Sequence, residues 1–261
     1  MSRTAVYSAL VLRSRPSGES NCEVTLLTAE EGLVRATVFG GPKSKLRAHS
    51  APYNSGQVWI YRDKAKDYGK LSDFDVKSWR PGLRELYERT MAAGGVAETI
   101  LSTHGGGGDW ESAIKLAVSA LDALEGANEE LCGQILVHFL WRWAGFLGLQ
   151  PHVESCAACG DRADGAPLWF SAVEGSVLCA ACTPEQAENR ALSPMSSKSS
   201  SVPGLLQLNP GCRRWLSAVE PLEPSLLHRF SLDNRSFSEA KLLATAVLTG
   251  ALGKRLASWD W

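Results

Sequence analysis

Short runs of alternating apolar and polar residues fill the first eighty residues of the chain, and turn residues separate the runs. A period of two is typical of strands that bury one face. The runs lie at residues 6–16, 23–28, 33–39, 57–61 and 71–76. Five short strands in this stretch predict a small β-barrel, and the OB-fold has this number of strands.

The fourth run carries two aromatic residues whose side chains could point either into the barrel or toward solvent. Trp59 and Tyr61 are two positions apart and therefore share one face of a strand. That face either fills the barrel or presents rings to solvent, where nucleic-acid bases can stack on them, together with Tyr53 and Tyr68. We expect Trp59 in the barrel core, because tryptophan is mostly buried in folded proteins.

After Trp79 the apolar spacing changes to three and four residues, which predicts helices. A first stripe runs through residues 83–101 and passes Gly94 and Gly95, where we expect a bend or a break. Asp109 is a suitable N-cap for a second helix.

The third helix is predicted to be the centre of the helical core. Asn128 is its candidate cap, and apolar residues then surround the helix on most sides. Further helices are expected at residues 210–219 and from Ser236, which has capping-box spacing to Glu239.

Four cysteines form the most specific motif of the chain. Cys156 and Cys159 make one C-x-x-C hook, and Cys179 and Cys182 make a second hook after nineteen residues. Two such hooks predict one tetrahedral metal site, most consistent with zinc, and four thiolates leave no open position for catalysis. The ion is therefore expected to be structural. The alternatives are a redox role for the hooks or a vestigial pair of hooks that binds no metal.

The predicted fold class is therefore α+β. An N-terminal OB-fold nucleic-acid-binding domain is expected at residues 1–80, and an α-helical domain at residues 81–261. The helical domain carries the inserted four-cysteine zinc finger at about residues 150–185. A serine-rich segment at about residues 193–203 is expected to be a flexible loop.

Composition indicates a globular protein of the cytoplasm. The 261 residues are 44% hydrophobic and 21% charged, with a mean hydropathy of −0.11. The most apolar segment, residues 131–149, contains His138 and Arg142 and is too polar to span a membrane. The N-terminus lacks the apolar core of a signal peptide. The other three cysteines are scattered, as expected for reduced, buried thiols: Cys22, Cys132 and Cys212.

The net charge of −1 conceals two unlike parts of the chain. Residues 1–80 hold 13 basic and 8 acidic residues, whereas residues 81–261 hold 14 and 20. Between Glu31 and Asp63 every charged residue is basic. This pattern suits a surface for a polyanion, although an ordinary solvated face has the same composition.

A basic loop follows the glycines at positions 40 and 41. Lys43, Lys45 and Arg47 alternate there, so in an extended chain their side chains would point the same way. The loop is not a phosphate-binding P-loop, because Pro42 rather than glycine precedes the lysine.

No set of residues predicts an enzyme. The five histidines lie in separate segments, and no motif of a hydrolase, kinase or dinucleotide-binding enzyme is present. His138 falls on the apolar third helix and is expected to be a core residue with its hydrogen bonds satisfied.

Taken together, these motifs resemble the RecO family of bacterial recombination-repair mediators. The likeness begins in the opening strand and turn, residues 9–20, and continues through Thr25-Leu26-Leu27-Thr28 and Gly32. Further along it includes Lys43-Ser44-Lys45-Leu46-Arg47, Pro52-Tyr53, Leu147-Gly148-Leu149-Gln150-Pro151 and the two cysteine hooks.

The resemblance implies an OB-fold followed by a helical domain with a zinc finger. It implies binding of single- and double-stranded DNA, annealing of complementary strands, and contact with RecR and with the C-terminal tail of the single-strand-binding protein. In that family the complex helps to load RecA recombinase onto covered strands.

One departure from the family affects the expected DNA contacts. The family commonly has extra basic residues just before the Lys43 position, where this chain has Phe39-Gly40-Gly41-Pro42. DNA binding is then expected to involve other cations of the barrel as well: Arg35, Arg62, Lys64, Lys66 and Lys70.

Two other functions fit parts of the sequence. The chain could be a protein-interaction adaptor that binds DNA only within a complex. It could also be a zinc-dependent nucleic-acid enzyme, but this requires a metal site with an open position.

Overall fold

The structure is a computed structural model that describes residues 4–41, 43–63, 68–183 and 204–259. The chain forms two compact units, which divide between Leu136 and Val137 inside helix α4 (Glu129–Phe146). We refer to them as the N-terminal unit and the C-terminal unit. Within the described ranges, each helix is too short or too polar to cross a lipid bilayer.

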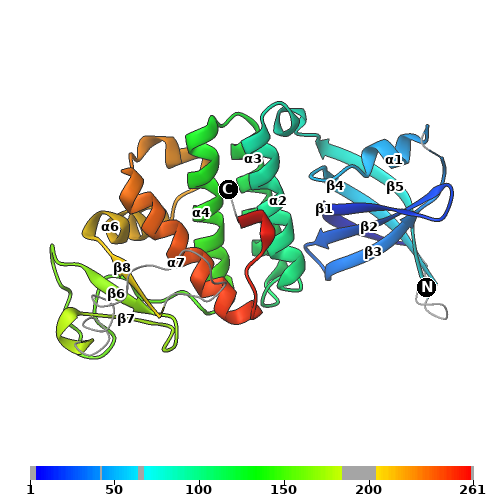
Figure 1. Ribbon diagram of the computed structural model, residues 1–261. Coiled ribbons are helices and arrows are strands. Elements are labelled where there is room, and N and C mark those ends of the chain that lie inside the picture. Colours follow the sequence, from blue (N-terminus) through cyan, green and yellow to red (C-terminus); the bar gives the residue numbers. More distant parts are fainter. Residues whose placement is uncertain (1–3, 42, 64–67, 184–203, 260–261) are drawn as a thin grey trace. The chain divides into compact units, whose positions relative to one another are not determined.

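The N-terminal unit begins with a closed five-stranded barrel, drawn in blue and cyan in Figure 1. Its strands pair in the order β1-β2-β3-β5-β4, and the contact between Thr37 and Lys70 closes the ring in parallel orientation. The predicted OB-type barrel is confirmed. The strands are β1 (Thr4–Ser17), β2 (Asn21–Thr28), β3 (Gly32–Val38), β4 (Ser55–Asp63) and β5 (Tyr68–Ser78).

Alternate residues of each strand fill the barrel. On β4 the inward residues are Val58 and Ile60, both fully buried, whereas Trp59 is only partly buried on the outer face. The expectation that Trp59 lies in the core is therefore wrong. Valine and isoleucine fit the narrow interior of a five-stranded barrel, which already holds Phe74, and an indole in their place would overfill it.

A short helix, α1 (Lys45–His49), lies between β3 and β4. Leu46 packs against the barrel core, and His49 donates from Nδ1 to the carbonyl of Phe74 at 2.9 Å. The expectation of an extended basic loop is thus wrong for part of this segment. Residues two apart on a helix point about 200° apart, so Lys45 and Arg47 do not share a face.

Two long helices complete the described N-terminal unit besides the start of α4. A 3-10 turn at Pro81–Arg84 leads into α2 (Tyr87–Ser102), and α3 (Trp110–Glu125) follows. Helix α2 continues through Gly94 and Gly95, so the chain does not break there. Its buried residues include Ala93 and Val96, and their packing offsets the roughly 1 kcal/mol that each glycine costs a helix.

Helix α3 also contacts the barrel directly. Asp109 caps this helix as predicted, because its side chain accepts a hydrogen bond from the backbone N–H of Ser112 at 3.1 Å. The adjacent Trp110 ring lies against Gly32, the first residue of β3, so closely that a Cβ on Gly32 would be 2.7 Å from the ring. Gly32 has a φ of +69°, so both its conformation and its contact require glycine.

The C-terminal unit combines helices with a small sheet of order β7-β6-β8. Asn128 caps α4 as predicted, accepting from the N–H of Leu131 at 2.9 Å. The remaining elements are β6 (Leu168–Ser171), β7 (Ser176–Leu178), β8 (Leu205–Leu208), α6 (Pro210–Val219) and α7 (Asn234–Leu252), with 3-10 turns at Ala180–Cys182, Pro224–Arg229 and Ala257–Trp259. The serine-rich segment lies outside the described residues.

The predicted capping box of the last helix is not formed. Asp233 is the N-cap of α7 and accepts from the N–H of Ser236 at 2.9 Å. Glu239 instead accepts from the backbone N–H of Asn209 at 2.6 Å, just before α6. A partner that is distant in the sequence has taken the carboxylate that the local motif would have used.

Candidate nucleic-acid interface and metal centre

The four predicted cysteines meet at one point of the C-terminal unit. The sulfur atoms of Cys156, Cys159, Cys179 and Cys182 all lie within 4.8 Å of one another, and those of Cys159 and Cys179 are 3.7 Å apart. Zinc–thiolate bonds of about 2.3 Å in a tetrahedron place sulfurs about 3.8 Å apart. The cluster therefore can hold a metal ion, and its dimensions are consistent with zinc.

Backbone geometry holds the two hooks in place. Gly160, with a φ of +75°, turns the chain so that its N–H donates to the carbonyl of Cys156 at 2.9 Å. The N–H of Ala157 donates to Val177 at 2.8 Å and joins the first hook to the strand that precedes the second. Because β7 and the following 3-10 turn carry the second hook, the hairpin of β6 and β7 sets the spacing between the hooks.

The thiols of the cluster have unequal acidities. Burial opposes ionisation of Cys156, but backbone N–H groups of Cys159 and Cys179 point at its sulfur and lower its pKa to about 6. The pKa of Cys182 is raised to about 12, first because the neighbouring sulfur of Cys179 shares its proton. Four thiolates so close together repel one another, so full ionisation requires a bound cation.

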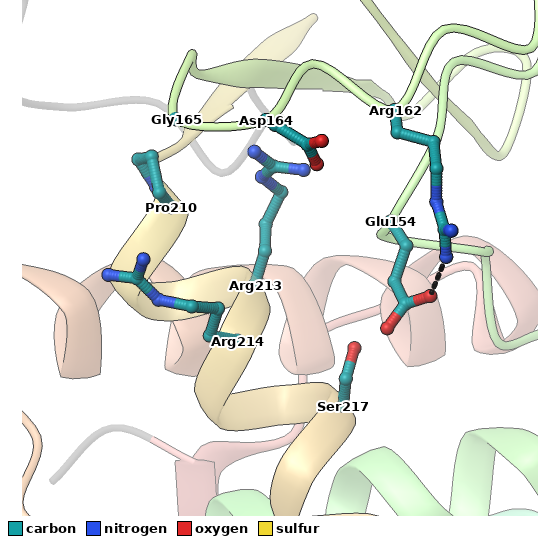
Figure 2. A pocket seen from close by; sticks show the side chains of 8 residues that line it. All are labelled: Glu154, Arg162, Asp164, Gly165, Pro210, Arg213, Arg214 and Ser217. Carbon is teal, nitrogen blue, oxygen red and sulfur yellow. Dashed lines mark hydrogen bonds and ion pairs between the residues drawn. The ribbon is translucent and has the colours of Figure 1, made fainter.

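Arg213 connects this metal-binding segment to α6. Its guanidinium donates to the carbonyls of Ala163 and Ala166 at 3.1 and 2.7 Å, and to that of Val153 at 3.4 Å. Figure 2 shows Arg213 reaching from α6 toward the loop that carries Asp164. The side chain is almost completely buried, and this burial lowers its pKa. Arg213 thus holds the metal-binding segment against α6 through hydrogen bonds to the backbone carbonyls of that segment.

A pocket of about 280 Å³ lies beside this contact. Its wall includes the exposed pair of Arg162 and Glu154, whose nitrogen and oxygen are 3.3 Å apart (Figure 2). Cations and carboxylates both line the pocket, so its charge alone does not select a ligand. The remaining lining residues are Asp164, Gly165, Pro210, Arg213, Arg214 and Ser217.

The predicted basic residues of the barrel lie mainly on its surface. Arg35 and Lys70 are exposed on the neighbouring strands β3 and β5, and Lys43 and Lys45 are exposed before and at the start of α1. Arg47 is partly buried. Among the described residues these five cations form no ion pair. Two further predicted contacts, Lys64 and Lys66, lie outside the described residues.

Arg62 differs from the other cations of the barrel. Its Nη2 lies 2.6 Å from a carboxylate oxygen of Glu31, and its guanidinium lies 5.4 Å from the centre of the Tyr7 ring. The hydroxyl of Tyr7 donates to the same carboxylate at 2.8 Å. The charge of Arg62 is therefore largely compensated within the protein.

Sequence reasoning did not single out the ring of Phe39, which lies beside the predicted contact Lys70. Its side chain is 44% exposed at the end of β3, and the amine of Lys70 lies 5.5 Å from the centre of its ring. The alternation of the strand could have indicated its exposure. Arg35, Thr37 and Phe39 occupy one face of the strand, while Ala36 and Val38 on the other face are buried.

Comparison with known proteins identifies the family. A family model described as Recombination protein O N terminal matches residues 1–79, and one described as Recombination protein O C terminal matches residues 84–260. The chain belongs to the RecO family. The expected resemblance is confirmed over almost the whole length, and the match assigns the chain to recombinational DNA repair.

Curated members of the RecO family align with most of the chain. DNA repair protein RecO of Anaeromyxobacter dehalogenans strain 2CP-1 is 30% identical over 256 residues, which are 97% of this chain and 94% of that protein. The RecO protein of Anaeromyxobacter sp. strain K is 30% identical over 253 residues, 96% and 92% of the two chains. That of Rubrobacter xylanophilus is 31% identical over 175 residues, 66% and 69%.

Proposed function

We propose that this chain is a DNA-binding mediator of recombinational repair. In this proposal it binds single- and double-stranded DNA, anneals complementary strands and, with RecR, helps to load RecA recombinase onto strands covered by single-strand-binding protein. Membership of the RecO family and the names of its relatives, which denote DNA repair, support this reading. It requires no covalent chemistry.

The exposed cations of the barrel carry the DNA-binding part of the proposal. Arg35, Lys43, Lys45 and Lys70 present charge to solvent without a carboxylate partner in the described parts of the chain, and Arg47 follows Lys45 on α1. A surface of this kind attracts phosphates and releases the counterions condensed on DNA. Arg62 has a smaller share, because Glu31 compensates its charge.

Annealing follows from the same electrostatics. Two DNA strands repel each other through their phosphates, and a cationic surface lowers that repulsion while it raises the local concentration of both strands. Base pairing then proceeds without any group of the protein reacting.

A strand-annealing assay on bare and protein-coated complementary oligonucleotides tests the proposal, alongside DNA binding over a range of salt concentrations. We expect log affinity to fall with log salt by about 0.7 per phosphate contact on single strands. A variant with Lys43, Lys45 and Arg47 all replaced by Ala is expected to bind at least 10-fold more weakly, on the order of 0.5 kcal/mol or more per lost contact.

The controls separate this function from that of an adaptor. The triple variant must retain the thermal unfolding of the parent chain, since Lys43 and Lys45 are exposed and Arg47 partly so. Binding that does not depend on salt would contradict the proposed interface. Binding that appears only after RecR is added would identify the chain as an adaptor instead.

We further propose that the four cysteines hold Zn²⁺ as a structural ion. The four sulfurs leave no position for a substrate, so the ion would brace the hairpin of β6 and β7. Metal analysis of the purified protein should give one zinc per chain.

The proposal also includes a protein partner and a location in the cell. The tail of the single-strand-binding protein is proposed to bind the helical part of the chain. Action on DNA is expected in the cytoplasm, at the nucleoid.

A further inference from the structure

The outer face of the barrel carries aromatic rings beside its cations. This face is formed by β3, β5 and β4, which are neighbours in the order of the barrel. Phe39 is 44% exposed just beyond the end of β3, and Tyr61 is partly exposed on β4. Lys70 on the central strand β5 is exposed between them.

Strand register shows that these residues share one face. Lys70 pairs with Tyr61 across β4 and with Thr37 across β3, and directly paired residues point to the same side of a sheet. Phe39 follows Thr37 by two positions and so keeps that side, with the amine of Lys70 5.5 Å from the centre of its ring. Arg35 precedes Thr37 by two positions and extends the face with a second cation.

The opposite faces of the same strands fill the barrel. Val38, Ile60 and Leu71 point inward and are fully buried in the barrel core. The outward rings therefore contribute little to that core. Farther along β4 the face also carries negative charge, because Trp59 pairs with the exposed Asp73 of β5. Among the residues that the structure describes on this face, the cationic and aromatic part consists of Arg35, Phe39, Tyr61 and Lys70.

The combination of rings and cations fits a single strand of nucleic acid. Bases stack on aromatic rings with little regard to sequence, while lysine and arginine between the rings meet the phosphates. Two strand spacings of about 4.8 Å separate β3 from β4, so the rings stand on the order of 10 Å apart. That distance is suited to bases of nearby nucleotides in an extended strand. In a duplex the faces of the bases are already stacked on one another and cannot reach the rings.

We propose that Phe39 and Tyr61 are base-stacking residues that strengthen the binding of single-stranded relative to double-stranded DNA, with Lys70 and Arg35 holding the phosphates between and beside them. The inference rests on the proposed DNA-binding function and adds to it. The basic residues around α1 act on any phosphate backbone, whereas the two rings recognise only unpaired bases.

The test measures binding of the full chain to three ligands: a single strand, a duplex of the same sequence, and an oligomer with the same backbone in which the bases are absent. A variant with Phe39→Ala and Tyr61→Ala is expected to lose about 5-fold or more in affinity for the single strand. Its affinities for the duplex and for the abasic oligomer should stay within about 2-fold of the parent chain, because neither offers a base to the rings.

Two further variants keep the result interpretable. Phe39→Trp retains an aromatic face and should bind the single strand at least as well as the parent chain. Tyr87→Ala removes a ring that is 71% exposed at the start of α2, outside the three strands of this face, and should change none of the three affinities. Thermal unfolding of each variant shows whether the barrel is intact.

The outcomes separate the two proposals. If the alanine variant loses the same factor for all three ligands, or loses nothing for the single strand, the stacking role of Phe39 and Tyr61 is wrong while DNA binding stands. If the folded parent chain binds none of the three ligands, the proposed DNA-binding function fails, and the inference fails with it.

Discussion

Arg80 donates from Nε to Oδ1 of Asp122 at 2.6 Å, although the side chain of Arg80 is fully buried and that of Asp122 is 51% exposed. The same guanidinium donates from Nη1 to the carbonyl of Tyr53 at 2.6 Å. Tyr53 precedes β4, and Asp122 lies on α3, so one side chain joins the barrel to a helix within the N-terminal unit. Because burial removes the cation from water, the carboxylate is needed more than an exposed partner would be.

We therefore expect Asp122→Ala to be destabilising even though it removes a half-exposed side chain. The change leaves a buried guanidinium without its carboxylate, which costs roughly 2–3 kcal/mol of unfolding free energy. Chemical denaturation measures this loss. Glu111→Ala is the matched control, since it breaks an ion pair of 2.7 Å to Lys115 on the same helix with both side chains exposed. If the two changes lower the free energy of unfolding equally, the ion pair of Arg80 and Asp122 is no stronger than an exposed pair, which would contradict this prediction.

The contact between Gly32 and Trp110 predicts a second difference. Gly32→Ala combines a positive φ with a clash against the ring, and is expected to cost roughly 2–5 kcal/mol. Gly18→Ala has nearly the same φ, +66°, but open space around the new methyl group, and is expected to cost only about 1 kcal/mol. The difference between their unfolding free energies reports the packing of the barrel on α3. No difference would mean that the ring does not lie there.

Removal of the metal is expected to affect the C-terminal unit and leave the barrel folded. Cys156→Ala takes one thiolate from the cluster, so binding of the proposed zinc ion should be lost or strongly weakened, with a loss of about 3 kcal/mol or more for the finger. Metal analysis and limited proteolysis of the hairpin measure this. Cys132→Ala is the control: burial raises the pKa of this thiol to about 11, and it lies outside the cluster. Unchanged zinc content in Cys156→Ala would exclude the four-cysteine site.

His138 is expected to make stability depend on pH in mildly acidic solution. It is fully buried, and burial, reinforced by the charge of Arg142, lowers its pKa from 6.5 to about 4. Its Nε2 donates to the carbonyl of Val219 at 3.0 Å, but Nδ1 has no partner, so the expectation of a fully satisfied core histidine is only half correct.

The sign follows from which state takes up the proton. Between pH 6.5 and about 4 the unfolded chain binds a proton at His138 and the folded chain does not, so stability falls as the pH falls, by up to about 3 kcal/mol. Above pH 6.5 this residue contributes no pH dependence. His138→Gln keeps a donor for Val219 and does not titrate. Its stability curve should therefore be flatter than that of the parent chain between pH 4 and 6.5, and identical slopes would contradict the assignment.

The pair of Glu31 and Arg62 predicts a gain in DNA affinity. Glu31→Gln removes the carboxylate that lies 2.6 Å from Arg62 and makes that cation available to phosphates. We expect the affinity for single strands to increase roughly 2- to 5-fold. This factor corresponds to about 0.5–1 kcal/mol, the energy typical of a surface ion pair. Glu30→Gln makes the same change of net charge one residue away, where the carboxylate accepts from Ser8 instead. A gain of equal size in both variants would show a general charge effect and no role for Arg62.

Several structural features could be predicted from the order of the residues alone. The spacing of the cysteine hooks predicted a cluster that the fold does bring together, and the alternating runs predicted all five strands of the barrel. Asp109 and Asn128 were recognised as caps because a cap acts on a backbone N–H only three residues away. Each of these features depends on groups that are close in the chain or joined by a fixed period.

Other features were settled by contacts between distant segments. Period two allowed either face of β4 to point inward, and the limited volume of the barrel selected Val58 and Ile60 over Trp59. Arg62 looked like a free cation until the fold placed Glu31 beside it, and Glu239 left its local motif for the N–H of Asn209. Sequence alone determined the strands of the barrel, the long helices and where a metal can bind, because periodicity and short-range capping are local. Tertiary structure decided which side chains face outward and which charges are already paired, because those depend on neighbours that only folding brings within reach.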